Sequence, residues 1–462
     1  MSTKKIHFEI SERKVLLRFF DIVAVFSGLY VIGFLVDFTY FSFSHSNISG
    51  FIVLACYLLT IGAIFEMYNL QVASNQFQII KSIVLTTCFS VLFYLLTPVF
   101  TPFLPSNRIQ ILIFFLTILI SLLLWRIFYQ KYLASYRFEK RVVLICDSEQ
   151  LSDLVFDLSK IDPHYKIIGV VCTTENNVLA ENQNIDLIQG QNLNNFVIKN
   201  AVSDIVIASQ HTKLLTLNLY NQLLHLLESG FPIREYTQVY ETLTQRIPIS
   251  HFGLDFYKFF PFSRSNNNKL YLLVARIIEI LLAIIGLIGG CILLPVVLIG
   301  NLVANQGSLF YIQERVGKNG LLFNIYKLRT MQKNAEKNGA VFATTNDSRI
   351  TTFGKFLRKT RIDEIPQFYN ILVGDMAFIG PRPERPFFVK KLSLDLPFYD
   401  TRHIIKPGLT GWAQVNYAYG ENTADSLIKL QYDLYYIKHR SVFLDINIII
   451  KTISTVLFYR GQ

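Results

Sequence analysis

Long apolar stretches alternate with short polar connections over the first third of the chain. Apolar side chains dominate roughly residues 15–36, 50–67, 79–100 and 109–129. A helix of about 20 apolar residues can cross a bilayer. The pattern therefore predicts four transmembrane helices within 1–135, the second being the shortest. These stretches hold almost no ionisable side chain away from their ends, which favours a membrane anchor over an ion pathway.

The basic residues around these stretches predict their orientation. The connection at 37–50 has no Lys or Arg, and the connection near 98–108 has only Arg108. By contrast, residues 126–141 contain five Lys and Arg residues. Because basic flanks stay on the cytoplasmic side, both ends of the bundle should face the cytoplasm.

The next block alternates short β-branched runs with helical stretches. Strands are expected at 142–146, 166–171 and 204–208, with helices near 148–160 and 212–229. This alternation is typical of a parallel sheet covered by helices, so we predict a Rossmann-like domain over 136–247. The first strand is followed by Cys-Asp-Ser-Glu-Gln and lacks the glycine fingerprint that lets a pyrophosphate approach a helix. We therefore expect a structural or regulatory module, not a dinucleotide site.

A linker over 248–268 precedes a second strongly apolar segment at 269–304. A single crossing here would place the following basic region outside the cell, against the distribution expected for Lys and Arg. Pro295 interrupts the apolar run, and proline breaks or kinks helices. The alternative that we favour is a re-entrant membrane helix, broken at Pro295, that returns to the side it entered from.

The remainder, 305–462, is amphiphilic, and the resemblance carried by its motifs implies that it is the catalytic domain. It ends in an apolar-periodic segment, Ser441 to Tyr459, that is typical of an amphipathic helix lying at a membrane surface. The expected fold class is thus membrane α/β. It comprises a four-helix transmembrane bundle, a Rossmann-like cytoplasmic domain, a re-entrant helix and a mostly α catalytic domain on the membrane.

Composition and charge agree with a membrane location. The 462 residues are 52% hydrophobic, include 39 Phe and carry a net charge of +11 at pH 7. Because the basic residues flank apolar runs, a membrane surface and a phosphorylated substrate explain them better than nucleic acid. The five cysteines and eight histidines show no metal-ligand spacing, and the cysteines are consistent with a reducing compartment.

Two adjacent acids, Asp363 and Glu364, are the central candidates for chemistry. They precede Pro366, and proline is best tolerated in the first turn of a helix while it pushes its predecessor, Ile365, out of the α region. A helix should start there, and its N-terminus should keep both carboxylates ionised and receive a phosphate. The later Gly380–Pro383 turn should present Arg382. An ionised acid, a cation and a helix N-terminus together suit phosphoryl transfer.

Five motifs in order carry a resemblance to a known family. They are Lys327-Leu-Arg-Thr-Met331, Arg361-Ile-Asp-Glu-Ile-Pro-Gln367, Val373-Gly-Asp-Met376, Ile379-Gly-Pro-Arg-Pro383 and Lys406-Pro-Gly-Leu-Thr-Gly-Trp-Ala-Gln-Val-Asn416. Over about 270–462 the chain resembles the bacterial sugar transferases, the monotopic phosphoglycosyl transferases. Its N-terminal half is similar to that of the larger members, which start exopolysaccharide, O-antigen or capsule assembly on undecaprenyl phosphate.

The resemblance implies a two-step transfer with Mg²⁺. The aspartate that matches Asp363 would attack the β-phosphate of a UDP-sugar, release UMP and pass the sugar phosphate to undecaprenyl phosphate. Glu364 would either hold the metal with Asp363 or orient it, and the sequence leaves both roles open. We expect five residues to bind the substrate and its phosphates: Lys327, Arg329, Arg361, Arg382 and Gln414. Trp412 is expected to be either a membrane-interface anchor or a stacking platform.

The predicted partners are a UDP-sugar, undecaprenyl phosphate and membrane lipid, in the bacterial inner (cytoplasmic) membrane with a cytoplasmic catalytic domain. The long apolar bundle is compatible with a homodimer. Glucose and galactose are the sugars that the resemblance implies, and the sequence does not choose between them. One departure from the family is Asn416-Tyr-Ala-Tyr419, where Asn-Gly-Arg is frequent. The rival hypotheses are a catalytically silent scaffold of a polysaccharide export complex and a polytopic transporter.

Overall fold

The chain folds into two compact units, Met1–Val239 and Tyr240–Gln462, which are described separately. The fold is taken from a computed structural model. The residues that it describes are 10–36, 38, 40–41, 47–68, 76–133, 140–147, 154–155, 165–172, 185–208, 216–249, 263–305, 307–332, 335, 347–417 and 422–457.

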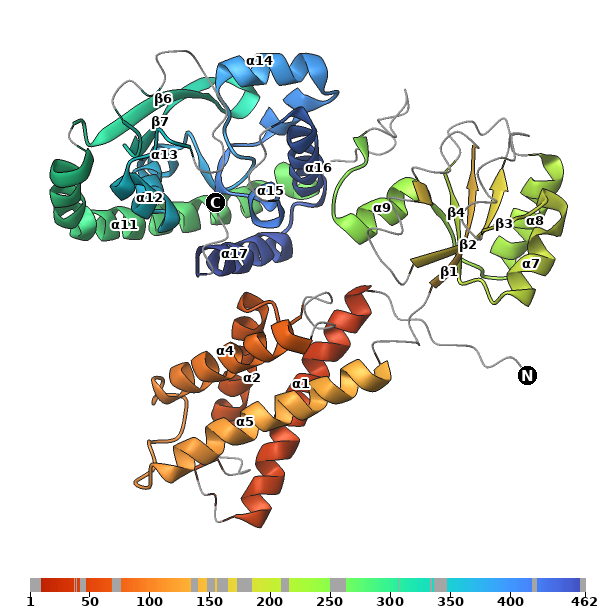
Figure 1. The fold of residues 1–462 in the computed structure, drawn as a ribbon, viewed down its shortest axis with the longest axis horizontal. Helices are drawn as coiled ribbons and strands as arrows, with labels where there is room; N and C mark the ends of the chain where they lie inside the picture. The colour runs from red at the N-terminus through yellow and green to blue at the C-terminus, as the bar shows by residue number, and fades with distance from the viewer. Residues whose placement is uncertain are drawn as a thin grey trace. The chain divides into compact units, whose positions relative to one another are not determined.

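Four apolar helices form where the hydrophobic pattern predicts them (Figure 1). They are α1 (Ile10–Leu35), α2 (Ile48–Ile64), α4 (Gln76–Leu95) and α5 (Ile109–Phe128). The apolar parts of α1 and α5 are long enough to cross a membrane, whereas those of α2 and α4 are shorter. The four helices are therefore confirmed, and a crossing by every one of them stays a prediction.

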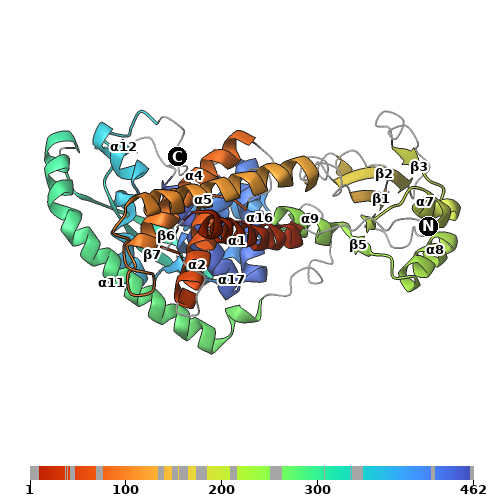
Figure 2. The same ribbon diagram turned by 90° about the horizontal axis from the view of Figure 1, so that it is seen from below.

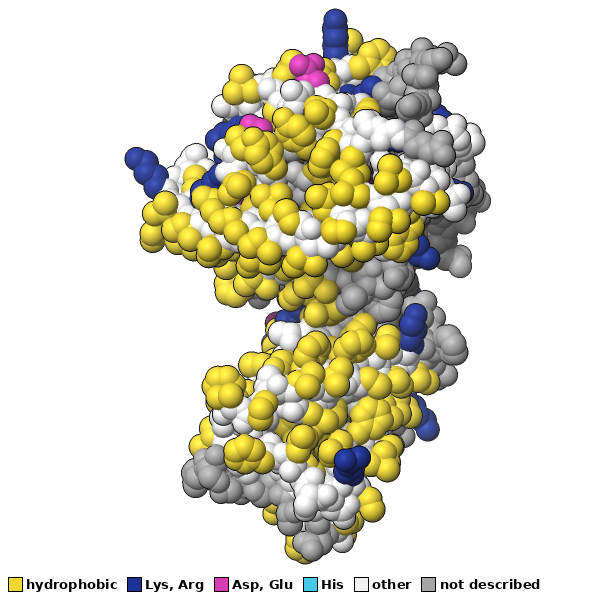
Figure 3. All heavy atoms as spheres, turned by 90° about the vertical axis from the view of Figure 1, so that its left-hand side faces the viewer, with side chains coloured by type: hydrophobic (Ala, Val, Ile, Leu, Met, Phe, Trp, Pro, Cys, Tyr) yellow, Lys and Arg dark blue, Asp and Glu magenta, His cyan; other side chains and the backbone are white. Residues whose placement is uncertain are grey.

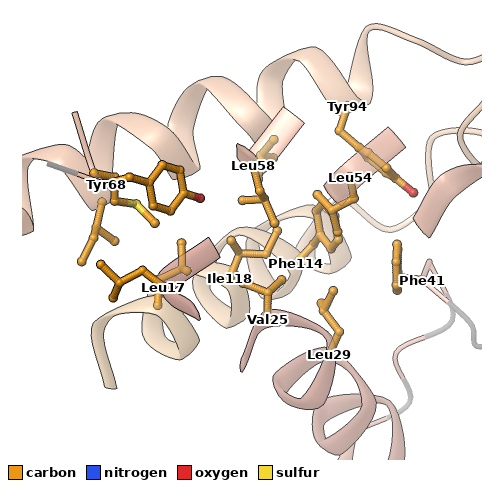
Figure 4. Packing of buried hydrophobic residues seen from close by; sticks show 14 of the residues in the cluster. Leu17, Val25, Leu29, Phe41, Leu54, Leu58, Tyr68, Tyr94, Phe114 and Ile118 are labelled. Carbon is orange, nitrogen blue, oxygen red and sulfur yellow. The ribbon is translucent and has the colours of Figure 1, made fainter. Parts of the chain in front are cut away.

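Aromatic and branched side chains fill the space between these helices (Figure 4). Leu54, Phe114 and Ile118 are fully buried, and the Phe114 ring lies 5.3 Å from the ring of Tyr94. At another point in the bundle Arg126 donates to Asp21 at 2.6 Å, with both side chains buried. Removing one partner of such a pair leaves an uncompensated charge, so this contact constrains how α1 and α5 pack.

A parallel five-stranded sheet follows, as predicted (Figures 1 and 2). Its strand order is β3-β2-β1-β4-β5, and its strands are β1 (Lys140–Cys146), β2 (Tyr165–Cys172), β3 (Asp186–Leu187), β4 (Asp204–Ile207) and β5 (Ile233–Glu235). Apolar residues of α7 (Leu193–Lys199) and α8 (Leu217–Glu228) pack on this sheet. Most of the helix expected near 148–160 lies outside the described residues. The order of the five parallel strands confirms the predicted Rossmann-like domain.

The division between the two units falls earlier than the predicted boundary at 247. Helix α9 (Tyr236–Thr244) crosses it, and beyond it Glu241 accepts from Lys438 at 2.7 Å in α16 (Thr423–His439). Ile247 also donates its backbone N–H to Gln431 at 3.2 Å. Residues 240–249 thus pack with the catalytic domain. Most of the predicted linker at 248–268 lies outside the described residues.

Helix α11 (Lys269–Gly300) is the second strongly apolar segment, and it continues into a π-helical turn at Asn301–Asn305. The predicted break at Pro295 is wrong, since Pro295 lies inside a continuous helix. A proline removes one backbone hydrogen bond and can bend a helix without ending it. Figure 2 shows the C-terminal end of α11 turning away from its first part. By length and composition this helix could also cross a membrane, so re-entry stays a prediction.

Three glycines allow α11 to approach the catalytic domain closely. A Cβ at Gly286 would lie 2.6 Å from the ring of Phe368, and one at Gly290 would lie 2.6 Å from Ile365. Gly300 makes the same kind of contact with Phe353. Most of the remaining apolar side chains of α11 are exposed, and Figure 3 shows apolar side chains along the lower edge of the catalytic unit, where this helix runs. Such a surface suits a lipid environment.

The catalytic domain is mostly α, as predicted, with two small two-stranded sheets. Its elements are β6 (Phe310–Val316), β7 (Leu322–Leu328), α12 (Thr352–Lys359), α13 (Gln367–Val373), β8 (Ala377–Ile379), α14 (Pro386–Asp395), β9 (Gly408–Thr410), α15 (Trp412–Asn416), α16 and α17 (Val442–Leu457). Helix α17 buries Ile448 and exposes the apolar residues Phe443 and Ile446, and its amphipathic character stays a prediction. Its attachment to a membrane surface stays a prediction.

Candidate active site

The two adjacent acids lie in a tight turn between α12 and α13. Arg361 has a left-handed backbone with φ of 59°, a 3₁₀ turn spans Ile362–Glu364, and α13 begins at Gln367 directly after Pro366. The predicted helix start is therefore confirmed. Ile365, however, has φ of −53° and ψ of −40°, so the expectation that it leaves the α region is wrong. Its helical conformation joins the 3₁₀ turn to α13 without an extended residue between them.

Glu364 lies at the centre of a cluster of positive charges. Its Oε1 lies 3.2 Å from Lys327 Nζ, 3.3 Å from Arg382 Nη2 and 3.8 Å from Arg361 Nη1. Burial alone would raise the pKa of Glu364, but these three cations hold it below its usual range. Glu364 is thus favoured in its ionised form and gathers three cations at one point.

Asp363 has the opposite environment although it is the neighbouring residue. It is 7% exposed, and its Oδ1 is buried with no hydrogen-bond partner. Within the described part of the chain, no ion pair reaches its carboxylate. Burial, followed by the charge of Glu364, raises the pKa of Asp363 to about 6. The shift of Asp363 runs against the expected effect of the helix N-terminus, because desolvation outweighs the field of a seven-residue helix, whereas the charge of Glu364 is held by the three cations.

Arg382 is presented by the Gly380–Pro383 turn, as predicted. The turn is anchored by three donors from elsewhere, which are Gly408 N to Pro381 O at 2.9 Å, Arg402 Nη2 to Arg382 O at 3.0 Å and Arg315 Nη1 to Pro383 O at 3.0 Å. The side chain of Arg382 remains 34% exposed where it meets Glu364. It can therefore contact both this acid and an incoming phosphate.

Arg329 does not join this cluster. Its Nε donates to Ser308 O at 2.8 Å and its Nη2 to Asn305 O at 2.9 Å, next to the end of α11. In the described residues, none of its hydrogen bonds reaches the acidic pair. The structure therefore brings together Lys327, Arg361 and Arg382, whereas Arg329 lies against the end of α11, and its contact with a diphosphate stays a prediction.

Two cavities flank the acids. The smaller, of about 180 Å³, has a mixed lining that includes Arg361, Glu364 and the predicted binding residue Gln414. The larger, of about 430 Å³, is apolar and is lined by α11 together with Ile362, Ile365 and Pro366. Ile365 contributes to both linings. The acidic turn thus lies between a pocket of mixed lining and an apolar one.

Trp412 is neither of the two things expected of it. It is 1% exposed, its Nε1 donates to Gln245 O at 3.2 Å, and Lys451 Nζ lies 4.4 Å from its ring centre. A side chain so enclosed cannot anchor in lipid headgroups or stack on a base. It is a core residue stabilised by a cation–π contact.

Sequence reasoning missed three buried polar residues that support the site. Asn370 donates to Asn324 O at 2.7 Å and so ties α13 to β7, the strand that carries Lys327. Arg402 pairs with Asp433 at 2.7 Å in the core. A usable signal existed for the last of these, since Asp433 interrupts the apolar face of α16 between core residues Leu430 and Leu434.

Comparisons with known proteins agree with this site. A family model described as bacterial sugar transferase matches residues 270–459. A second model, described as a CoA-binding domain, matches 63–218, a range that includes apolar helices as well as most of the parallel sheet.

Individual relatives also match the catalytic half. An Aeromonas hydrophila protein named UDP-N-acetylgalactosamine-undecaprenyl-phosphate N-acetylgalactosaminephosphotransferase is 42% identical over 228 residues, which are 49% of this chain and 52% of that protein. An uncharacterized sugar transferase of Bacillus subtilis, EpsL, is 38% identical over 158 residues, 33% of this chain and 72% of its own. A Xanthomonas campestris UDP-glucose:undecaprenyl-phosphate glucose-1-phosphate transferase is 39% identical over 40% of each chain. The chain thus spans about half the length of the first of these relatives.

Proposed function

Because this chain belongs to the bacterial sugar transferase family, we propose that it transfers a sugar 1-phosphate from a UDP-sugar to undecaprenyl phosphate. The observation that carries the proposal is the contrast between two neighbouring acids. Asp363 has an unpartnered carboxylate oxygen, while Glu364 holds Lys327, Arg361 and Arg382 around it. One acid is suited to attack a phosphorus atom, and the other to assemble the cations that bind the phosphates.

In the first step the Asp363 carboxylate attacks the β-phosphorus of the UDP-sugar. A bond forms between a carboxylate oxygen and that phosphorus, and the bond from the bridging oxygen to the β-phosphorus breaks. UMP leaves with the bridging oxygen, and the sugar phosphate stays on Asp363. Lys327, Arg361 and Arg382 offset the charge that builds up on the phosphate oxygens.

In the second step a phosphate oxygen of undecaprenyl phosphate attacks the same phosphorus. The acyl phosphate bond to Asp363 breaks, so the carboxylate is regenerated and a polyprenyl diphosphate sugar is released. Dividing one displacement into two allows each half to use the same cations. The product would start the assembly of an exopolysaccharide, O-antigen or capsule.

Magnesium fits this site through Asp363 better than through Glu364. The buried Oδ1 of Asp363 has no partner, which is the kind of oxygen that a divalent cation would coordinate. The charge of Glu364 is already balanced by three cations, so it is better placed as an organiser. No group of three or more His, Cys, Asp or Glu side chains forms a metal site in the described residues, so the remaining ligands would be phosphate oxygens and water. Bound magnesium would supply neutralisation of the diphosphate charge.

Three helices of the described residues are long and apolar enough to cross a membrane, and the protein is therefore treated as a membrane protein. We place it in the bacterial inner membrane with the acids on the cytoplasmic side, where nucleotide sugars are made. A homodimer remains compatible with this arrangement.

The test of the proposed function is UMP release by the detergent-solubilised full chain with Mg²⁺ and undecaprenyl phosphate. The panel of donors should include UDP-glucose, UDP-galactose and UDP-N-acetylgalactosamine, since the named relatives use different sugars. We expect UMP to be released from at least one donor, with a lipid-linked sugar diphosphate as the second product. If no donor in the panel yields UMP, the silent scaffold becomes the better hypothesis.

The rate of the first step should depend on pH through Asp363. Its pKa is raised to about 6, and only the deprotonated carboxylate can attack phosphorus. A raised acid pKa means that the reactive form is lost as the pH falls through about 6, and protons and Mg²⁺ would compete for this carboxylate. At low Mg²⁺ the single-turnover rate of UMP release, measured between pH 5 and 8, should fall about tenfold for each pH unit below about 6, and added Mg²⁺ should move this loss to lower pH. A loss at low pH that does not move with Mg²⁺ would contradict the prediction.

A further inference from the structure

The Gly380–Pro383 turn, which presents Arg382, has few backbone N–H groups of its own to fix its conformation. Two of its four residues, Pro381 and Pro383, have no backbone N–H to donate. Its carbonyls instead accept from distant donors, and the carbonyl of Arg382 itself accepts from Arg402 Nη2 at 3.0 Å. Neighbouring residues of the turn are held by Gly408, Arg315 and Thr410, but the Arg382 carbonyl itself is held by a side chain that lies 20 residues further along the chain.

Arg402 is itself fixed on two other sides. Its Nη2 also lies 2.7 Å from Asp433 Oδ2, and its Nη1 donates to the hydroxyl of Tyr399 at 2.7 Å. The side chains of Arg402 and Asp433 are only 6% and 2% exposed. A planar guanidinium held at both ends in a buried pocket has little freedom to move. It is a rigid support for the carbonyl that it contacts.

The side chain of Arg382 needs such a support because it is long and 34% exposed. An arginine side chain samples many rotamers, and the number of places its guanidinium can reach falls when its backbone is fixed. The backbone end of this side chain is held by Arg402, and its guanidinium lies 3.3 Å from Glu364. Small displacements of a charged contact matter in transition-state stabilisation.

We propose that Arg402 is a positioning residue, which sets where the Arg382 guanidinium meets the diphosphate of the donor by holding the Arg382 carbonyl. This inference rests on the proposed function, because it assumes that a nucleoside diphosphate binds beside Arg382. Arg402 itself need not touch the substrate. Its effect should therefore exist only while the Arg382 side chain is present.

A double-mutant cycle tests this dependence. One arm is Arg402→Met combined with Asp433→Leu, which removes the hydrogen bond to the carbonyl and leaves no unpaired buried charge. The other arm is Arg382→Ala, and a fourth protein carries all three substitutions. The affinity for UDP with Mg²⁺ is measured for each full chain in detergent, together with UMP release by those that are active.

We expect the Arg402 and Asp433 substitutions to weaken UDP binding about tenfold when Arg382 is present, and less than twofold in the Arg382→Ala protein. An equal factor in both backgrounds would overturn the proposal, because a general structural role acts whether or not Arg382 is there. Tyr399→Phe gives a graded comparison, since it removes one of the two contacts that fix Arg402 and leaves the bond to the Arg382 carbonyl. It should weaken UDP binding less than the paired substitution does, and only while Arg382 is present.

A failure of the paired variant to fold and a failure of the proposed function can each be distinguished from a failure of this proposal. If the paired substitution prevents folding, as judged by thermal unfolding, Arg402→Lys takes its place in the same cycle. Lysine keeps a charge beside Asp433 but lacks the fork that reaches both partners, so the same loss and the same dependence on Arg382 are expected. If the parent binds UDP but releases no UMP from any UDP-sugar, the proposed function fails while the cycle on binding still decides the role of Arg402.

Discussion

Asp363→Asn should reduce UMP release from the preferred UDP-sugar by at least about a thousandfold while the protein stays folded. Asparagine has nearly the same shape as aspartate, but its amide cannot attack phosphorus. The buried site already disfavours the charge of Asp363, so its removal should not destabilise the fold. The measurement is UMP release in detergent with Mg²⁺, alongside thermal unfolding.

The same variant also tests the covalent step. When the parent protein is mixed with donor and no lipid, its mass should increase by one sugar phosphate, and Asp363→Asn should show no increase. Asp375→Asn is a suitable control, since Asp375 lies after α13 and contacts Asn370 at 3.4 Å. It should retain labelling. Near-normal UMP release by Asp363→Asn would remove Asp363 as the nucleophile.

Glu364→Gln should have a different outcome, because it should damage both stability and activity. Without the carboxylate, the positive charges of Lys327, Arg361 and Arg382 repel one another around a neutral amide. The two arginine side chains are about one third exposed, so solvent reduces the cost, and we expect the free energy of unfolding to fall by about 2 kcal/mol. UMP release should fall about a hundredfold, as expected when charge stabilisation of a transition state is disturbed.

The comparison with a double variant makes this prediction specific. Glu364→Gln with Lys327→Met removes one of the repelling charges, so it should regain part of the lost thermal stability and none of the activity. An unfolding temperature of Glu364→Gln equal to that of the parent would show that Glu364 does not organise the cations. Residual activity similar to that of Asp363→Asn would leave the two acids with indistinguishable roles.

The sequence could predict those features of the site that are determined by residues close together in the chain. Pro366 starts a helix and Gly380–Pro383 forms a turn because both effects depend on proline and its immediate neighbours, whereas the placement of Arg382 in that turn also depends on distant donors. The parallel sheet was predictable for a similar reason, since buried strands have a characteristic run of β-branched residues. In each case the information lies within a few residues of the feature.

The structure differs from the predictions where the position or the pKa of a site residue depends on contacts between distant segments. Lys327 and Arg329 are two residues apart, yet one reaches Glu364 and the other the carbonyls at the end of α11. Asp363 and Glu364 are adjacent, yet their pKa values move in opposite directions because the cations reach only one of them as ion pairs. The Arg402–Asp433 pair joins residues 31 positions apart. A pattern of residue types cannot encode such partners.

The close approach of α11 at Gly286 and Gly290 has a consequence for how the two proposed substrates would arrive. Phe368 and Ile365, on either side of the start of α13, pack closely against these glycines. The acidic turn is therefore held at a fixed distance from the apolar helix. A lipid acceptor confined to one leaflet would then search for the site by diffusion in two dimensions, while a nucleotide sugar reaches it from bulk water. The lipid would therefore meet the site through the membrane and the nucleotide sugar through water, at different rates. A sugar phosphate held on Asp363 would let them occur at different times.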